Sequence, residues 1–178
     1  MIQSISGLLM SMGTSERKIR LCMRKNSLDL EIAVDRNIED VFGLLHDYDR
    51  RLSWDKFLKR AEILRGPVGV GCEVLCQEKK LGFKMQVEYM SYKPPVLAAI
   101  RMTKGPKFLA SFTGTWLLTK KSASSTVVKF HYNIIGNPVW LGSVLRFLFT
   151  QESKARLRNL KNFLELDSPT NFRSRNDQ

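Results

Sequence analysis

The chain has 178 residues, of which 43% are hydrophobic and 26% are charged. This length suits one domain with a substantial core, and the composition excludes wholesale disorder. Lysine and arginine number 29 against 17 acidic residues, and the resulting net charge of +12 favours anionic partners such as phospholipid, nucleic acid or acidic ligands. The cations are spread along the chain, so the charge alone fits a merely soluble basic surface equally well.

Both ends of the chain differ from its middle. Residues 1–26 are basic and are predicted to form an N-terminal arm, either flexible or folded as a short interfacial helix. They lack the charged start and the long apolar stretch of a secretory signal, and no apolar run in the chain reaches membrane-spanning length. Residues 167–178 are polar and are predicted to be a disordered tail.

The cysteines point to a reducing compartment. Cys22, Cys72 and Cys76 are odd in number and contain no CxxC pair, which argues against a disulfide framework and against a zinc site. Free thiols suit the cytoplasm, so a cytoplasmic protein is expected.

The elements follow one another in a simple order. Ser27–Val34 alternates apolar and polar residues, which predicts a half-buried strand. Asn37 can cap a short helix that begins at Ile38, and Asp47–Arg51 leads into a second short helix or an irregular segment. Further strands are predicted at residues 61–64, 72–76, 83–89, 96–102, 112–118 and 128–134. The short turns between them predict an antiparallel meander that is apolar on one face.

One long helix is predicted for Pro138–Leu166. Asn137 suits the N-cap and Pro138 suits the first helical position. Its length requires a large apolar surface, which the strands provide. Leu141–Phe149 is apolar nearly all round and is the part expected to form a cavity wall and mouth, whereas the part from Lys154 onward is one-sided.

Four motifs along the chain together resemble the START-like, helix-grip superfamily (SRPBCC), in particular its polyketide cyclase/dehydrase and lipid-transport branch. They are the run Asn37–Leu45, the Trp-Asp pair that opens Trp54–Leu64, Gly69-Val70-Gly71 and Gly114-Thr115-Trp116. The resemblance covers roughly Leu28 to Leu166 and implies a single α+β domain over residues 27–166. In that fold a curved antiparallel sheet of about seven strands wraps around the long C-terminal helix, with two short helices after the first strand.

The resemblance further implies a cavity for an apolar ligand between the sheet and the long helix. Small and flexible residues interrupt the bulky ones on the apolar strand faces, which supports a pocket, and Tyr89 and Tyr132 would be its polar groups. Any one of these side chains more commonly fills a core. The predicted ligand-binding residues are Trp54, Phe83, Met85, Val87, Tyr89, Ile100, Met102, Phe112, Trp116, Phe130, Tyr132, Leu145, Leu148 and Phe149.

No catalytic residue, metal site or cofactor is predicted. His131 falls on the solvent side of its strand, and His46 ends the first short helix, where a cation suits the helix dipole. Glu152 either faces the cavity or forms a surface pair with Arg156 at i,i+4. Trp54 is either part of a lid at the cavity mouth or a packing anchor.

The function expected is binding or transport of a hydrophobic small molecule, lipid-like or polyketide-like. One alternative is a polyketide cyclase or dehydratase that uses Tyr89, Tyr132 or Glu152 as acid or base, although no motif names a reaction. The other is a basic module that binds a membrane surface or nucleic acid. The strand aromatics share a face with the aliphatic residues, so base stacking is disfavoured, and an anionic membrane is the better partner. The sequence leaves the oligomeric state open.

Overall fold

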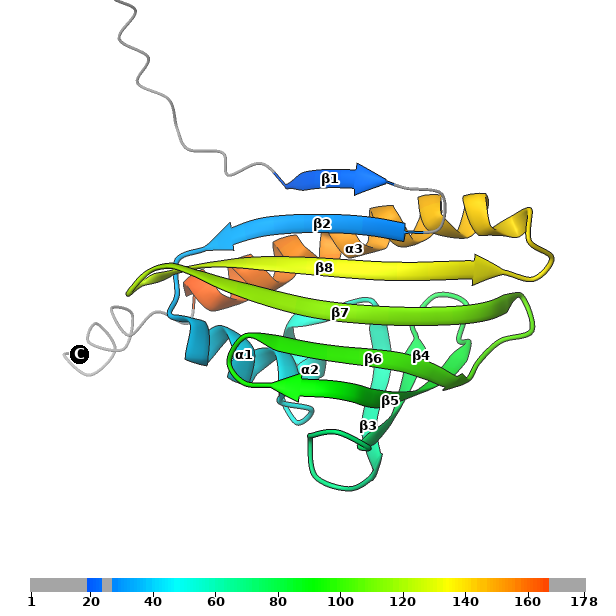
Figure 1. The fold of residues 1–178 in the computed structure, drawn as a ribbon, viewed down its shortest axis with the longest axis horizontal. Helices are drawn as coiled ribbons and strands as arrows, with labels where there is room; N and C mark the ends of the chain where they lie inside the picture. Colours follow the sequence, from blue (N-terminus) through cyan, green and yellow to red (C-terminus); the bar gives the residue numbers. More distant parts are fainter. Residues whose placement is uncertain (1–18, 24–26, 167–178) are drawn as a thin grey trace, which may run out of the picture.

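The computed structural model describes residues 19–23 and 27–166, which form one antiparallel sheet crossed by a long helix (Figure 1). The strand order is β1-β2-β8-β7-β6-β5-β4-β3, and every neighbouring pair is antiparallel. In chain order the elements are β1 (Arg20–Met23), β2 (Ser27–Val34), α1 (Ile38–His46), α2 (Arg51–Trp54), β3 (Leu58–Arg65), β4 (Glu73–Glu78), β5 (Lys84–Lys93), β6 (Leu97–Lys104), β7 (Leu109–Ser122), β8 (Ser125–Gly136) and α3 (Leu141–Leu166). This is the predicted α+β helix-grip fold.

The alternating pattern of the sequence specified which strand faces are buried. In β2, Leu28 and Leu30 are buried, and Asp29 between them is not. In β8, Phe130 and Tyr132 are buried while Lys129 and His131 lie on the other face. The cap of α1 is also as predicted, because the side-chain oxygen of Asn37 accepts a 2.7 Å hydrogen bond from the Asp40 amide.

The sheet has one strand more than the sequence predicted. β1 pairs with the outer edge of β2, with Leu21 opposite Leu30. A four-residue strand with no clear alternation gives little signal by itself. The rest of the predicted N-terminal arm lies outside the described residues, as does the predicted tail at residues 167–178.

The long helix begins three residues later than predicted, at Leu141. Asn137 is not the N-cap of this helix. The backbone N–H of Asn137 donates to the Phe108 carbonyl at 2.9 Å, and the side-chain amide donates to the Lys107 carbonyl at 3.2 Å. Residues 137–140 therefore form a turn that is tied to the connection between β6 and β7. Sequence pattern could not show this long-range contact.

The two halves of α3 lie in different environments. α3 packs against β2, β8 and α2, and its second half buries Leu157, Leu160 and Leu164. In the first half Leu145 is buried, whereas Val144 and Phe147 are exposed. No helix in the described part of the chain is long and apolar enough to cross a membrane.

Candidate functional site

Two spaces lie beside α3 on the apolar side of the sheet. The first, here called the inner cavity, has a volume of about 50 Å³. This is well below the roughly 300–1,000 Å³ of most small-molecule sites. Its lining consists of Tyr48, Arg51, Phe57, Leu58, Cys76, Met85, Val87, Tyr89, Ile100, Phe112, Trp116, Tyr132, Phe149 and Arg156.

The second space, here called the groove, is an open, strongly apolar hollow of about 480 Å³ along the first half of α3. That volume is within the range of small-molecule sites. Charged side chains occur at its rim, where Lys80 and Glu152 form an ion pair. The lining residues are Phe57, Glu78, Lys80, Leu81, Phe83, Phe108, Leu141, Val144, Leu145, Leu148, Phe149 and Glu152.

Phe57 and Phe149 line both spaces and therefore separate the inner cavity from the groove. Their ring centroids are 6.3 Å apart, and the Phe149 ring also lies 5.9 Å from that of Phe112. The groove and the smaller inner cavity therefore meet at these two rings.

The polar wall of the inner cavity is built around the buried carboxylate of Asp55. Arg156 binds this carboxylate with two hydrogen bonds, of 2.9 Å and 2.7 Å, and Arg51 adds a third of 2.9 Å. The Asp55 side chain is fully buried. Burial by itself would raise the pKa of Asp55, but the charges of Arg156 and Arg51 outweigh burial and hold this pKa below its usual value.

Each of the two guanidinium groups has one further hydrogen-bond partner. Arg156 donates to the Tyr132 hydroxyl at 3.1 Å, and Arg51 donates to the Leu45 carbonyl at 2.6 Å. The Arg51 guanidinium stacks 4.5 Å from the ring centre of Trp54. Two cations around one carboxylate leave a positive charge in the wall of the inner cavity, which is suited to an electron-rich oxygen of a ligand.

A second polar chain runs along the cavity through His46, Tyr89 and Tyr48. The Tyr89 hydroxyl lies 2.9 Å from His46 Nδ1 and 2.7 Å from the Tyr48 hydroxyl. Burial, with a smaller contribution from the charge of Arg51, lowers the pKa of His46 to about 3. Burial also raises the pKa of Tyr48 to about 12 and raises that of Tyr89. The imidazole is therefore neutral at pH 7, and the expectation of a cation on the helix dipole is wrong.

Glycine at position 114 makes room for the cavity wall. A Cβ atom added there would lie 3.0 Å from the Tyr132 ring, closer than such contacts normally come. The Gly-x-Trp spacing thus puts the Tyr132 ring against bare backbone and places Trp116 in the wall of the cavity.

The predicted ligand-binding residues divide between the two spaces. Those at the inner cavity are Met85, Val87, Tyr89, Ile100, Phe112, Trp116, Tyr132 and Phe149. Phe83, Leu145 and Leu148, again with Phe149, line the groove.

Three of the predicted residues line neither space. Trp54 is buried with its ring against that of Trp116, so it is a packing anchor and not part of a lid. Phe130 is buried in the core, and the sulfur atom of Met102 lies next to Gly105.

The prediction missed the two arginines. Of the two alternatives for Glu152, a pair with Arg156 is wrong, whereas Glu152 does line an apolar space, at the rim of the groove. Arg156 binds Asp55, and Glu152 contacts Lys80. The signal was available, since Arg156 lies three residues after the buried Ser153 and four before the buried Leu160, on the inner face of α3. The i,i+4 spacing of Arg51 and Asp55 was a second signal.

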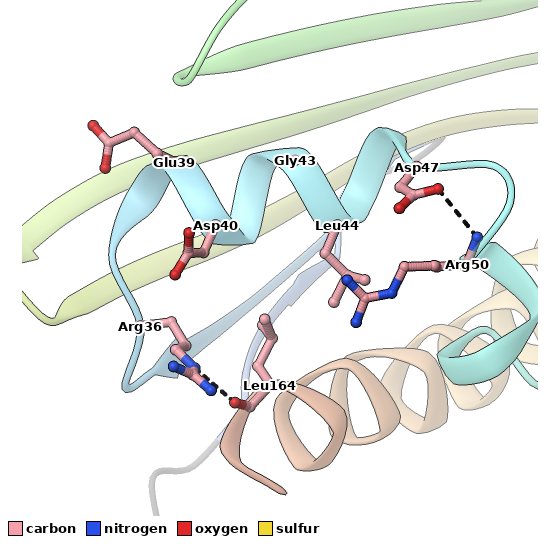
Figure 2. Close-up of a pocket in the computed structure, with 8 residues that line it drawn as sticks. All are labelled: Arg36, Glu39, Asp40, Gly43, Leu44, Asp47, Arg50 and Leu164. Carbon is pink, nitrogen blue, oxygen red and sulfur yellow. Dashed lines mark hydrogen bonds between the residues drawn. The ribbon is translucent and has the colours of Figure 1, made fainter. Parts of the chain in front are cut away.

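A third hollow, of about 400 Å³, lies outside the sheet between α1 and the end of α3 (Figure 2). Charged side chains line most of it, among them Glu39, Asp40 and Asp47. Arg36 closes one end by donating to the Leu164 carbonyl at 2.7 Å, as Figure 2 shows. This lining is unsuited to an apolar ligand. Among the described residues, no group of three or more His, Cys, Asp or Glu side chains is placed to hold a metal ion.

Comparison with known proteins identifies the family. A model of the family described as "Polyketide cyclase / dehydrase and lipid transport" matches residues 25–165. The chain belongs to this family. A search of curated protein sequences finds no match.

Solved structures with the same fold include proteins of different roles. The Zhui aromatase/cyclase from Streptomyces sp. R1128 has a TM-score of 0.71 and 15% identity, over 78% of this chain and 93% of that one. A START superfamily protein from Mycobacterium smegmatis has a TM-score of 0.69 and 12% identity, over 80% and 99%. The di-domain ARO/CYC StfQ of steffimycin biosynthesis has a TM-score of 0.65 and 17% identity, over 79% and 51%. At these identities the likeness establishes the fold alone.

The first prediction concerns the buried carboxylate. Asp55→Asn removes the anion between Arg51 and Arg156, and breaking a buried pair of this kind costs about 3–5 kcal/mol. We expect urea denaturation at pH 7 to show a loss of this size in the free energy of unfolding. The matched control is Glu62→Gln, which breaks the exposed pair with Arg60 and should leave the stability unchanged. Equal stabilities of the two variants would contradict the assignment of Asp55.

The second prediction concerns pH. The pKa of His46 is lowered from 6.5 to about 3, so below pH 6.5 the unfolded chain binds a proton that the folded chain does not. The stability from neutral His46 is complete above pH 6.5 and is lost as the pH falls toward 3. Between pH 7 and pH 5 the free energy of unfolding should fall by about 2 kcal/mol.

His46→Gln should remove this part of the pH dependence in urea denaturation. His131→Gln is the control, because His131 is partly exposed on the other face of the sheet, beside Asp29. A slope that disappears only in the His131 variant would contradict the assignment to His46.

Proposed function

We propose that the protein binds a hydrophobic small molecule in the groove and holds it for storage or transfer. The observation that carries the proposal is an apolar hollow of about 480 Å³ that reaches the surface beside the first half of α3. Family membership supports hydrophobic ligand binding or a cyclase role without deciding between them. Burial of apolar surface would drive binding, at roughly 25 cal/mol per Å².

The polar end of such a ligand would point inward. Phe57 and Phe149 line both the groove and the inner cavity. On the inner-cavity side of these two rings lie the Tyr132 hydroxyl and the Arg156 guanidinium. A ligand with an apolar body and one oxygen-bearing end matches both surfaces. A cytoplasmic location remains a prediction from the free thiols.

The groove is tested with N-phenyl-1-naphthylamine, a neutral probe whose fluorescence rises in apolar sites. We expect saturable binding to the wild type and at least about tenfold weaker binding to Leu148→Glu, because the change puts a charge into the apolar lining. The matched control is Ile63→Glu, at a similarly exposed residue of β3 that lines neither space. The proposal fails if the wild type does not bind the probe, or if Leu148→Glu binds it as well as the wild type does.

A second candidate function is cyclisation or dehydration of a polyketide-like substrate. The observation in its favour is the pair of polar groups at the inner end, where Arg156 donates to Tyr132 and Tyr89 joins the chain to His46. Burial raises the pKa of Tyr132 and of Tyr89, so both phenols stay protonated and act as hydrogen-bond donors to a carbonyl oxygen, not as bases. Glu152 is less suited, because it is paired with Lys80 at the rim.

If the protein is a cyclase, a substitution at Tyr132 should reduce turnover without weakening ligand binding in the groove. Tyr132→Phe should reduce turnover of a poly-β-ketone thioester analogue by about a hundredfold, since one donor to a developing oxyanion is removed. Binding of N-phenyl-1-naphthylamine in the groove should change less than about twofold, because Tyr132 does not line it. A wild type without turnover, or a variant with full turnover, would leave ligand binding as the function.

A further inference from the structure

Large apolar side chains are exposed around the mouth of the groove. They are Leu81, Val139, Trp140, Val144, Phe147 and Leu148, here called the mouth patch. Val139 is 79% exposed, Leu81 78% and Trp140 72%. Contiguous exposed surface of this kind on a globular protein marks an interaction site, whereas single exposed apolar residues need no explanation.

The mouth patch is continuous. Leu81, Val144 and Leu148 line the groove, so they surround its opening. Val144, Phe147 and Leu148 lie three and four residues apart on the first turns of α3, which places them on one side of the helix, and Trp140 is in the turn directly before it. Asn137 ties this turn to residues 107 and 108. Figure 1 shows the connection from β8 to α3 and the connection from β6 to β7 at the same end of the sheet.

Cations surround the mouth patch. Lys79 and Lys80 lie in the β4–β5 connection, and Lys84 begins β5. Lys104 ends β6, Lys107 lies in the β6–β7 connection, and Arg146 is on α3. Two carboxylates lie close by, and both are engaged: Glu78 accepts hydrogen bonds from the amides of Lys80 and Leu81, and Glu152 pairs with Lys80. The six cations outnumber these two carboxylates, so the described surface around the mouth carries a net positive charge.

We propose that the mouth patch docks on an anionic lipid bilayer, with Trp140 and Phe147 inserted at the level of the headgroups. The two parts of the surface match the two chemistries of a bilayer: apolar side chains meet the acyl region, and cations meet anionic headgroups. Aromatic residues such as tryptophan favour this interfacial depth. A second copy of the chain fits less well, because two mouth patches would bring their cations together.

Docking goes beyond the proposed ligand binding, because it would give an apolar ligand a path between the membrane and the groove. With the patch on the bilayer, the groove opens into the membrane, and an apolar molecule passes between the two without crossing water.

The full chain provides its own reporter for a test. It has three tryptophans, all in the described part, of which Trp54 and Trp116 are buried, so environment-dependent changes in emission report on Trp140. We expect vesicles of phosphatidylcholine with phosphatidylglycerol to shift the emission to the blue and to co-sediment with the protein. High salt should reverse the binding, and vesicles of phosphatidylcholine alone should bind at least about tenfold more weakly.

Variants separate docking from ligand binding. Phe147→Ser and the double variant Lys104→Glu/Lys107→Glu should each weaken vesicle binding by about tenfold or more, whereas the control Val70→Ser, at a similarly exposed apolar residue of the β3–β4 connection, should not. None of these residues lines the groove, so binding of N-phenyl-1-naphthylamine in solution should persist in all of them. If Phe147→Ser or the double lysine variant loses vesicle binding but still binds the probe, the result supports membrane docking independently of ligand binding.

Three outcomes would overturn the proposal. One is a wild type that does not bind anionic vesicles, and another is binding that Phe147→Ser leaves unchanged. The third is a blue shift that depends on protein concentration in the absence of vesicles, because the mouth patch would then be covered by a second copy of the chain. Each of these results tests docking independently of whether the groove binds N-phenyl-1-naphthylamine.

Discussion

The carboxylate of Asp55 is the point at which the helices and the sheet of this protein are joined. It follows α2, accepts hydrogen bonds from Arg51 of α2 and Arg156 of α3, and connects through Arg156 to Tyr132 of β8. An early element, α2, and the last two elements of the sheet and helix, β8 and α3, therefore meet at one buried charge. An unpaired charge here would be costly, so α3 must bring its guanidinium to this place.

This constraint fixes one half of α3 and leaves the other half free for function. From Ser153 onward the helix is held by the ion pair and by buried leucines. Before that point its apolar residues exceed what the sheet can cover, and the excess forms the groove and the mouth patch. The second half of the helix thus stabilises the fold, and the first half borders the groove in which we propose that a ligand binds.

The polarity of the walls also changes from the mouth of the groove to the inner cavity. At the mouth the walls are apolar and the rim is basic, whereas beyond Phe57 and Phe149 the walls carry protonated phenols and a net positive charge. An amphiphile would meet each surface in turn. A hydrogen-bond donor at the inner end can hold an oxygen or stabilise a developing oxyanion, so the same geometry is compatible with either proposed function, carrier or cyclase.

The sequence by itself determined the order of the elements, the buried face of each main strand and the cap of α1, because period-two alternation and capping are local properties. It also predicted that the first half of the long helix borders an open space. Only the tertiary structure showed that Arg51 is buried and Arg156 partly buried beside Asp55, that His46 is neutral, and that the turn at Asn137 is tied to the β6–β7 connection. Each of these depends on residues far apart in the chain, and burial of the His46 ring is what lowers its pKa. The division into a small polar cavity and a larger apolar groove likewise depends on how two rings, Phe57 and Phe149, meet in space.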